Sequence, residues 1–243
     1  MNILLNFLYP QRCLSCGKLG KYICDHCVSM IQFIDADLCP VCRKPAIDGK
    51  THPRCQTKYS LDGLTSFFKY KDPIRETIKR IKYKPFAFDV SKTLVFLALK
   101  NINQKSFFQQ VIKEKPILVP IPLHHSRERA RGFNQAEVLG KILAEKWDLQ
   151  FIPNLLIRTR KTQPQYKLKG KERKENLKKA FNINPNYPII PTESRGSSTQ
   201  GVGTNYSVIL FDDLWTTGTT MRVCGNLLKR AGAKFVWGLT MAR

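Results

Sequence analysis

Two adjacent carboxylates followed by a threonine-rich turn are the residues of this sequence best suited to chemistry. Asp212 and Asp213 come directly after the apolar run 208–211. The turn behind them consists of Thr216, Thr217, Gly218, Thr219 and Thr220. A helix that starts in such a turn directs unpaired backbone N–H groups and the positive end of its dipole at one spot, which favours a phosphate. Because the carboxylates can accept hydrogen bonds from vicinal hydroxyls, the stretch predicts a sugar-phosphate site.

The elements that must position these groups follow from hydrophobic spacing. The apolar run before Asp212 is typical of a buried parallel strand, and residues 221–231 have helical spacing. Residues 116–123 predict a second buried strand, followed by a basic loop and a helix from about Asn134. Residues 234–241 predict a strand beside the Asp212 strand. Neighbouring parallel strands share their carboxyl edge, so the basic loop is expected to form the second wall of the site.

The rest of the chain predicts further elements of both kinds. Strands are expected at 61–70 and 151–157, and a short packed helix at the start of the chain. Asp72-Pro73 is expected to open a helix, and a further helix is expected at 90–101.

The cysteines predict metal binding. Seven of the eight lie before residue 56: six form three pairs separated by two residues, and the seventh, Cys55, has the same spacing from His52. The candidate ligands are Cys13, Cys16, Cys24, Cys27, Cys39, Cys42, His52 and Cys55. Zinc takes four such ligands, so eight predict two structural zinc ions. The simplest partition is sequential, although an interleaved one remains open, and His52 is the least secure ligand. Because zinc knuckles without an export signal argue against disulfides, a reducing cytoplasm is expected.

The charge of the chain predicts a polyanionic partner. The formal net charge is +23, from 41 basic and 18 acidic residues. Residues 69–84 carry seven basic and two acidic side chains, and residues 158–179 carry ten and two. Nucleic acid is the first candidate and an anionic membrane surface the second. Alternatively, the charge reflects a proteome that is rich in lysine throughout, without such a partner. The sequence holds no run of 18 uncharged apolar residues, so no membrane span is expected.

Two stretches resemble known families. SVILFDDLWTTGTTM resembles the 5-phosphoribosyl-1-pyrophosphate (PRPP) signature of type I phosphoribosyltransferases. This resemblance implies an α/β fold with a doubly wound, mostly parallel sheet. It also implies that Asp212 and Asp213 bind the ribose hydroxyls, that Thr216 to Thr220 bind the 5-phosphate, and that magnesium accompanies PRPP.

The second stretch, VPIPLHHSRERARGFNQAEVLGKILA, resembles the ComF/GntX family of phosphoribosyltransferase-like proteins with an N-terminal zinc ribbon. In several bacteria this family is linked to the uptake of single-stranded DNA. The resemblance implies a pyrophosphate loop with Arg127, Arg129 and Arg131. It also implies a flexible loop that closes over PRPP, whose pattern is Arg158, Arg160, Thr162, Gln165, Arg173 and Asn176.

The expected organisation is a double zinc ribbon at 1–58 and a phosphoribosyltransferase-like domain at 59–243, with a flexible basic loop at 158–179 and a Ser/Gly-rich loop at 191–205. The resemblance implies a ComF-type protein that binds PRPP or another phosphoribosyl ligand and handles single-stranded DNA, with competence or helicase-type proteins as partners. The alternative is an active phosphoribosyltransferase with an unidentified acceptor. No feature of the sequence supplies an acceptor pocket, so the catalytic residues stay unassigned.

Overall fold

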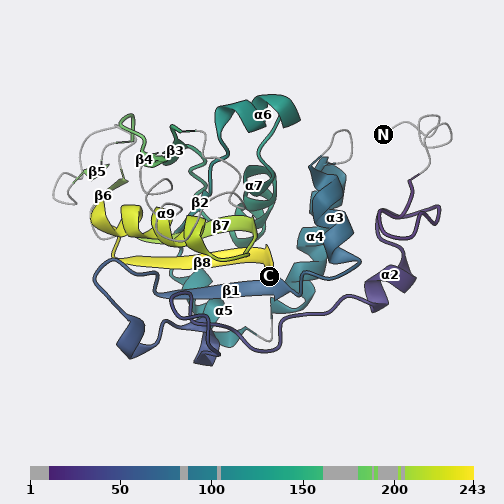
Figure 1. The fold of residues 1–243 in the computed structure, drawn as a ribbon, viewed down its shortest axis with the longest axis horizontal. Coiled ribbons are helices and arrows are strands. Elements are labelled where there is room, and N and C mark those ends of the chain that lie inside the picture. Colours follow the sequence, from purple (N-terminus) through teal and green to yellow (C-terminus); the bar gives the residue numbers. More distant parts are fainter. Residues whose placement is uncertain are drawn as a thin grey trace.

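A four-stranded parallel sheet forms the centre of the protein (Figure 1). The computed structural model describes residues 11–82, 87–102, 105–160, 180–187, 189–190, 202–203 and 206–243. The strands of the sheet, in spatial order, are β1 (Gly63–Phe68), β8 (Phe235–Ala242), β7 (Ser207–Leu214) and β2 (Ile117–Pro120). Phe211 of β7 lies opposite Pro120 of β2, and Asp212 lies opposite Thr240 of β8. The carboxyl ends of β2 and β7 therefore meet at one edge, as predicted.

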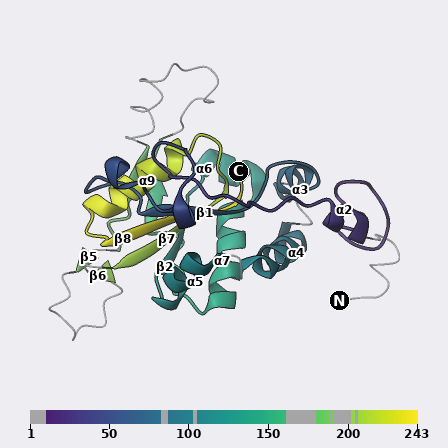
Figure 2. The ribbon, with the colours of Figure 1, turned by 90° about the horizontal axis from the view of Figure 1, so that it is seen from below.

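Both faces of the sheet are covered, which explains the apolar run in β7. Side chains alternate along a strand, so Val208 and Leu210 face one core while Ile209 and Phe211 face the other. The first core lies under α9 (Thr219–Arg230). The second lies under α3 (Ile74–Ile81), α4 (Ala87–Lys100), α5 (Ser106–Lys113) and α7 (Gln135–Trp147), on the opposite side of the sheet (Figure 2).

The helices that pack on the sheet have a clear amphipathic pattern. Three of them bury residues at spacings of three and four: Ile74, Thr77, Ile78 and Ile81 in α3; Ala136, Leu139, Gly140 and Leu143 in α7; Met221, Cys224, Gly225 and Leu228 in α9. The predicted α/β class, with a parallel sheet, helices on both faces and an N-terminal cysteine module, is confirmed.

The basic stretch after β2 is a helix, contrary to the predicted loop. α6 (His125–Arg131) begins at buried His124, whose side chain accepts a hydrogen bond from the backbone N–H of Ser126. It ends at Gly132, which has a left-handed backbone (φ 81°). No residue of α6 is buried, so the hydrophobic pattern that reveals the other helices is missing here.

The structure corrects further expectations. The strand predicted at 151–157 is only an isolated bridge between Phe151 and Leu118, and a short strand β3 (Leu156–Arg158) follows it. β3 pairs antiparallel with β4 (Phe181–Ile183), outside the main sheet. β6 (Val202–Gly203) pairs with β5 (Ile189–Ile190) where the Ser/Gly-rich stretch was expected to be loop throughout. α5 was not predicted.

The cysteine module lies along one border of the larger α/β part. Its helical pieces are α2 (Asp25–Ser29), η1 (Ile47–Gly49) and η2 (Pro53–Cys55). In both ribbon views α2 lies at one end of the molecule and η1 and η2 lie toward the other (Figures 1 and 2). The segment between them runs beside β1, where the N–H of Ile34 donates to the carbonyl of Phe67 (2.9 Å). A buried ion pair between Lys105 and Asp37 (3.0 Å) fastens this segment to α5.

Several expectations fall outside the described residues. These are the helix expected at 1–10, the loop from residue 161 to 179, and residues 191–201 and 204–205 of the Ser/Gly-rich stretch. The domain boundary at residue 58 stays a prediction. Across the described part of the chain, every helix is too short or too polar to cross a lipid bilayer.

Candidate functional site

A small pocket lies where β7 leads into α9. Its lining comprises Asp212, Leu214, Trp215, Thr216, Thr217, Gly218, Thr219, Thr220 and Met221. The first N–H groups of a helix have no acceptor within the helix, and those at the start of α9 belong to residues of this lining. The carboxylate and the threonine turn singled out in the sequence thus form one concave site.

Gly218 sets the shape of the threonine turn. It precedes α9 with a left-handed backbone (φ 69°), which disfavours residues with a Cβ. A Cβ at this position would also lie 2.0 Å from the indole ring of the buried Trp215. Directly after it, the hydroxyls of Thr217 and Thr219 are 3.0 Å apart. The turn is therefore held in a conformation that only glycine permits and that gathers two hydroxyls.

Of the two adjacent carboxylates, Asp212 lines the pocket and Asp213 does not. The two side chains nevertheless lie close together, since Asp213 acts on Asp212 through both its charge and its side chain. The backbone N–H of Asp213 donates to Oδ1 of Asp212 (2.9 Å). Burial, together with the charge of Asp213, raises the pKa of Asp212 well above its ordinary value. A ligand that brings hydrogen-bond donors or positive charge would relieve this cost.

Two cations from separate elements, Arg158 and Lys82, interact with Asp212, and a third, Arg127, lies near Arg158. Arg158 on β3 is affected by the charges of both Asp212 and Arg127, and burial lowers its pKa. Its guanidinium lies 5.1 Å from the centre of the Phe181 ring. The charge of Lys82, at the end of α3, also acts on Asp212. Arg158 was expected in a flexible loop, but it belongs to a strand and is partly buried.

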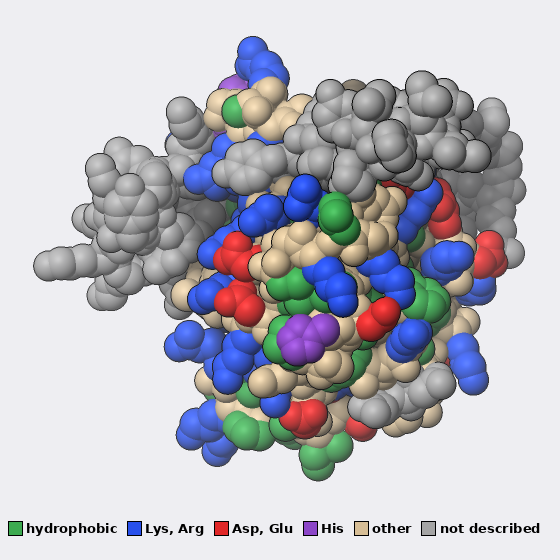
Figure 3. Space-filling model, turned by 90° about the vertical axis from the view of Figure 1, so that its right-hand side faces the viewer, with side chains coloured by type: hydrophobic (Ala, Val, Ile, Leu, Met, Phe, Trp, Pro, Cys, Tyr) green, Lys and Arg blue, Asp and Glu red, His purple; other side chains and the backbone are tan. Residues whose placement is uncertain are grey.

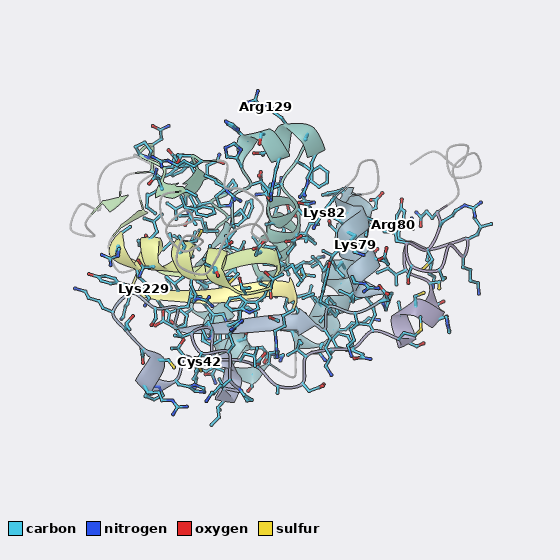
Figure 4. All side chains as sticks on the ribbon, viewed as in Figure 1. Cys42, Lys79, Arg80, Lys82, Arg129 and Lys229 are labelled. Carbon is cyan, nitrogen blue, oxygen red and sulfur yellow. The ribbon has the colours of Figure 1, made fainter. Side chains whose placement is uncertain are left out.

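The remaining predicted cations do not all converge on this pocket. Arg131 donates to Oε1 of Gln135 (3.0 Å), and Arg129 is exposed at the outer edge of α6, directed away from the sheet (Figure 4). Arg160 is exposed after β3. Thr162, Gln165, Arg173 and Asn176 lie outside the described residues.

Arg222 is a site residue that sequence reasoning missed. It lies in the first turn of α9, directly after Met221 of the pocket lining. Its guanidinium donates to the hydroxyl of Thr219 (3.5 Å). The same guanidinium donates to the carbonyl of Pro40 (3.0 Å), which lies between Cys39 and Cys42. Arg222 thus connects the threonine turn directly to the segment between Cys39 and Cys42. No local pattern could reveal this contact, because 182 positions separate the two residues. Lys82 was noted only as part of a basic segment.

The ligand atoms of the cysteine module form two tight clusters. In each, all four atoms lie within 4.8 Å of one another: Cys13, Cys16, Cys24 and Cys27 in the first cluster, and Cys39, Cys42, His52 and Cys55 in the second. The sequential partition is therefore confirmed, and His52 belongs to its cluster. Sets of four thiolates, or of three thiolates and one imidazole, fit tetrahedral structural zinc.

Local hydrogen bonds prepare both clusters for a metal. In the second, Nδ1 of His52 lies 3.3 Å from Sγ of Cys42, while Nε2 lies 2.9 Å from the carbonyl of Pro45. A proton on Nε2 would leave Nδ1 free for zinc, as metal-binding histidines require. In the first cluster, burial by itself would raise the pKa of Cys13. Hydrogen bonds from the backbone N–H groups of Cys16 and Cys24 outweigh this effect of burial, so the pKa of Cys13 is lowered to about 6. A thiolate is the form that binds zinc.

Comparison with known proteins agrees with this geometry. Residues 4–56 match the model of the double zinc ribbon domain. Competence protein F of Haemophilus influenzae is 29% identical over 234 residues, which cover 95% of this chain and 90% of that protein. Competence protein ComFC of Bacillus subtilis is 28% identical over 235 residues, which cover 93% of this chain and 86% of that protein. The DNA utilization protein YhgH of Salmonella typhimurium is 30% identical over 226 residues, covering 88% and 87%.

Proposed function

The chain belongs to the ComF family of competence and DNA utilization proteins, and from this we propose that it binds PRPP, or another phosphoribosyl ligand, while handling single-stranded DNA in DNA uptake or a related process. Two structural zinc ions hold its N-terminal ribbon. Since zinc thiolates persist in reducing compartments, we expect the protein in the cytoplasm.

One observation carries the phosphoribosyl proposal: Asp212 and the turn from Thr216 to Thr220 line the same pocket. The start of α9 would hold the 5-phosphate through N–H groups and threonine hydroxyls. The carboxylates of Asp212 and Asp213 would accept hydrogen bonds from the ribose hydroxyls. Arg127 and Arg158 would lie near the pyrophosphate, and magnesium bound with the ligand would help to neutralise its negative charge.

The DNA part of the proposal is supported by charge and by the relatives. The net charge of +23 exceeds what a single phosphoribosyl ligand needs, and it favours a polyanion. The names of the relatives refer to competence and DNA utilization. Competence or helicase-type proteins are further partners that we expect on this basis.

Isothermal titration with PRPP and magnesium tests the pocket. The native protein should give saturable heat at one site per chain, and Asp212→Asn/Asp213→Asn should remove it. Asp148→Asn is the matched control, because that exposed carboxylate pairs with Lys115 far from the pocket in sequence and should leave the heat unchanged. Native protein without any binding heat would reject the phosphoribosyl proposal. Pyrophosphate release on addition of a candidate acceptor would instead establish the alternative, an active phosphoribosyltransferase.

A further inference from the structure

The outer face of α4 carries a regular stripe of aromatic and basic side chains. Among the described side chains of this helix, the exposed ones are Phe88, Lys92, Phe96 and Lys100, spaced four residues apart. The phenyl groups are 53% and 58% exposed, although large apolar side chains are usually buried. The helix itself is well packed, because Val90, Leu94 and Ala98 on its inner face are completely buried.

Each exposed phenyl group has a lysine beside it. Nζ of Lys92 lies 4.3 Å from the centre of the Phe88 ring, and Nζ of Lys100 lies 4.7 Å from that of Phe96. A helix rises about 1.5 Å per residue, so the two phenyl groups are about 12 Å apart along it. Along the helix axis, aromatic and basic residues of the stripe therefore alternate in steps of about 6 Å, and each ammonium group lies over the phenyl ring of the preceding aromatic residue.

This alternation fits a single-stranded nucleic acid better than an apolar partner. Aromatic faces stack on bases without regard to sequence, and ammonium groups neutralise the phosphates between them. The separation of about 12 Å corresponds to three or four nucleotides at about 3.4 Å each. A protein helix or a lipid surface would instead favour a continuous apolar stripe. The only acidic residue of α4, Asp89, is partly buried and does not belong to the stripe.

The stripe begins beside the first zinc cluster. Tyr22, which lies between Cys16 and Cys24 in the sequence, packs against the core that contains Val90. Its pKa is raised by burial and by the charge of Asp89. The cluster adds the exposed cations Arg12 and Lys18. Figure 3 views the side of the molecule toward which α2, α3 and α4 lie, and Lys and Arg side chains are spread over it among hydrophobic and some acidic ones. A strand bound to α4 would thus continue onto a basic surface.

We propose that the stripe Phe88, Lys92, Phe96 and Lys100 on α4 is a stacking platform for single-stranded DNA. The inference rests on the proposed function, because it assigns the DNA handling of the family to one helix face. It separates the DNA surface from the phosphoribosyl pocket: the stripe belongs to α4, whereas the pocket lies between β7 and α9.

Fluorescence anisotropy with a labelled oligo(dT) and the full-length, zinc-loaded protein tests this assignment. Phe88→Ala/Phe96→Ala should weaken binding about tenfold or more, since each removes a stacking contact. Lys92→Ala/Lys100→Ala should lower the slope of log K against log salt by about 0.7 per lysine. Ile47→Ala is the matched control, because Ile47 is an apolar side chain that is 85% exposed outside the stripe.

An abasic oligonucleotide of the same length separates stacking from charge. The double phenylalanine variant should bind it as the native protein does, whereas the double lysine variant should bind it more weakly. Phe88→Trp/Phe96→Trp should retain oligo(dT) affinity, and the fluorescence of the new indoles should be quenched on binding. All these side chains are exposed, so unchanged thermal unfolding and zinc content verify the fold of each variant.

Three outcomes would overturn the assignment. If the native protein binds oligo(dT) and the double phenylalanine variant binds it equally well, the platform is wrong while the DNA function stands. If the native protein does not bind oligo(dT) at all, the DNA function itself fails. If it binds vesicles of anionic phospholipid through Phe88 and Phe96 in place of oligo(dT), the stripe is a membrane surface.

Discussion

Gly218 shows how one residue determines the geometry of the proposed phosphate site. Its positive φ and its contact with Trp215 leave no space for a methyl group, and the N–H groups of the following turn depend on its conformation. The threonine hydroxyls and Asp212 then lie around the same pocket. Substitutions at this position should therefore affect stability and ligand binding together.

Gly218→Ala should lower the free energy of unfolding by about 2 kcal/mol or more, because strain at positive φ and overlap with the indole ring add up. Urea unfolding measures this loss, and PRPP titration should show weaker binding by the same variant. Gly17→Ala is the control for backbone strain alone, since Gly17 also has positive φ (80°) but no atom near its missing Cβ. Equal losses for the two variants would contradict the contact with Trp215.

Asp212 should reduce the stability of the ligand-free protein at neutral pH. Because its pKa is raised in the folded state, the stability that comes from this group is present below the ordinary aspartate pKa and is lost as the pH rises through the raised one. Asp212→Asn should therefore raise the melting temperature at pH 7 and change it less under acid conditions. Thermal unfolding between pH 4 and 8 measures both effects. A variant that melts below the native protein at pH 7 would contradict the raised pKa.

At the scale of elements, the two cysteine clusters join parts of a segment whose only helical pieces, among the described residues, are α2, η1 and η2. So short a segment needs the metal for its stability. The second cluster also contacts the site, because the carbonyl of Pro40 accepts a hydrogen bond from Arg222 of α9. The ribbon is thus part of the support of the candidate site.

Metal analysis of the purified protein should find about two zinc ions per chain, as two four-ligand clusters require. His52→Ala should reduce this value to about one, and His52→Cys should restore it because thiolate replaces imidazole. His26→Ala is the control, since His26 is exposed in the first ribbon and belongs to neither cluster. Two zinc ions in His52→Ala would remove His52 from the ligand set.

The link through Arg222 should couple the second zinc cluster to ligand binding. Arg222→Ala and His52→Ala should each weaken PRPP binding, and their effects should be less than additive because both release the start of α9 from the ribbon. Titration calorimetry of the two single variants and the double variant measures this coupling. If the losses in PRPP affinity were strictly additive, the hydrogen bond between Arg222 and Pro40 would not couple the second zinc cluster to the ligand site.

The sequence predicts those elements whose signal is local. The strand β7, the helix α9 and the cysteine knuckles were recognisable because alternation, helical spacing and ligand spacing are all short-range. The helix α6 was missed because it buries nothing and so lacks periodicity, although arginine, glutamate and alanine are good helix formers. The position of Arg158 on β3 depends on pairing with Phe181, and the contact of Arg222 depends on Pro40, and both are long-range.

At the scale of the whole molecule, the two proposed binding functions make different demands on the distribution of charge. A phosphoribosyl ligand uses a few fixed groups at the edge of the sheet, whereas a polyanionic strand uses many lysines and arginines spread over the surface. We expect the net charge of +23 to serve the second of these proposed functions. Loss of the first should therefore leave the second largely intact.

Binding of oligo(dT) should weaken steeply as salt is raised. For each phosphate that the protein neutralises, the logarithm of the association constant should fall by about 0.7 per tenfold rise in salt concentration. Asp212→Asn/Asp213→Asn should bind it about as tightly as the native protein, because the substitutions remove no positive charge. Anisotropy titrations at several salt concentrations measure this. Salt-independent binding would contradict an electrostatic interface, and loss of DNA binding in the double variant would place the strand in the phosphoribosyl pocket.

Backbone hydrogen exchange tests the central claim, that the turn after β7 binds a phosphoribosyl group, most directly. With PRPP and magnesium, exchange at Thr216 to Thr220 should slow in the native protein, because the phosphate oxygens would accept hydrogen bonds from these N–H groups. In Asp212→Asn/Asp213→Asn the same segment should exchange as in the ligand-free protein. If PRPP leaves the exchange of this segment unchanged in the native protein, or protects only residues elsewhere, the assigned site is wrong.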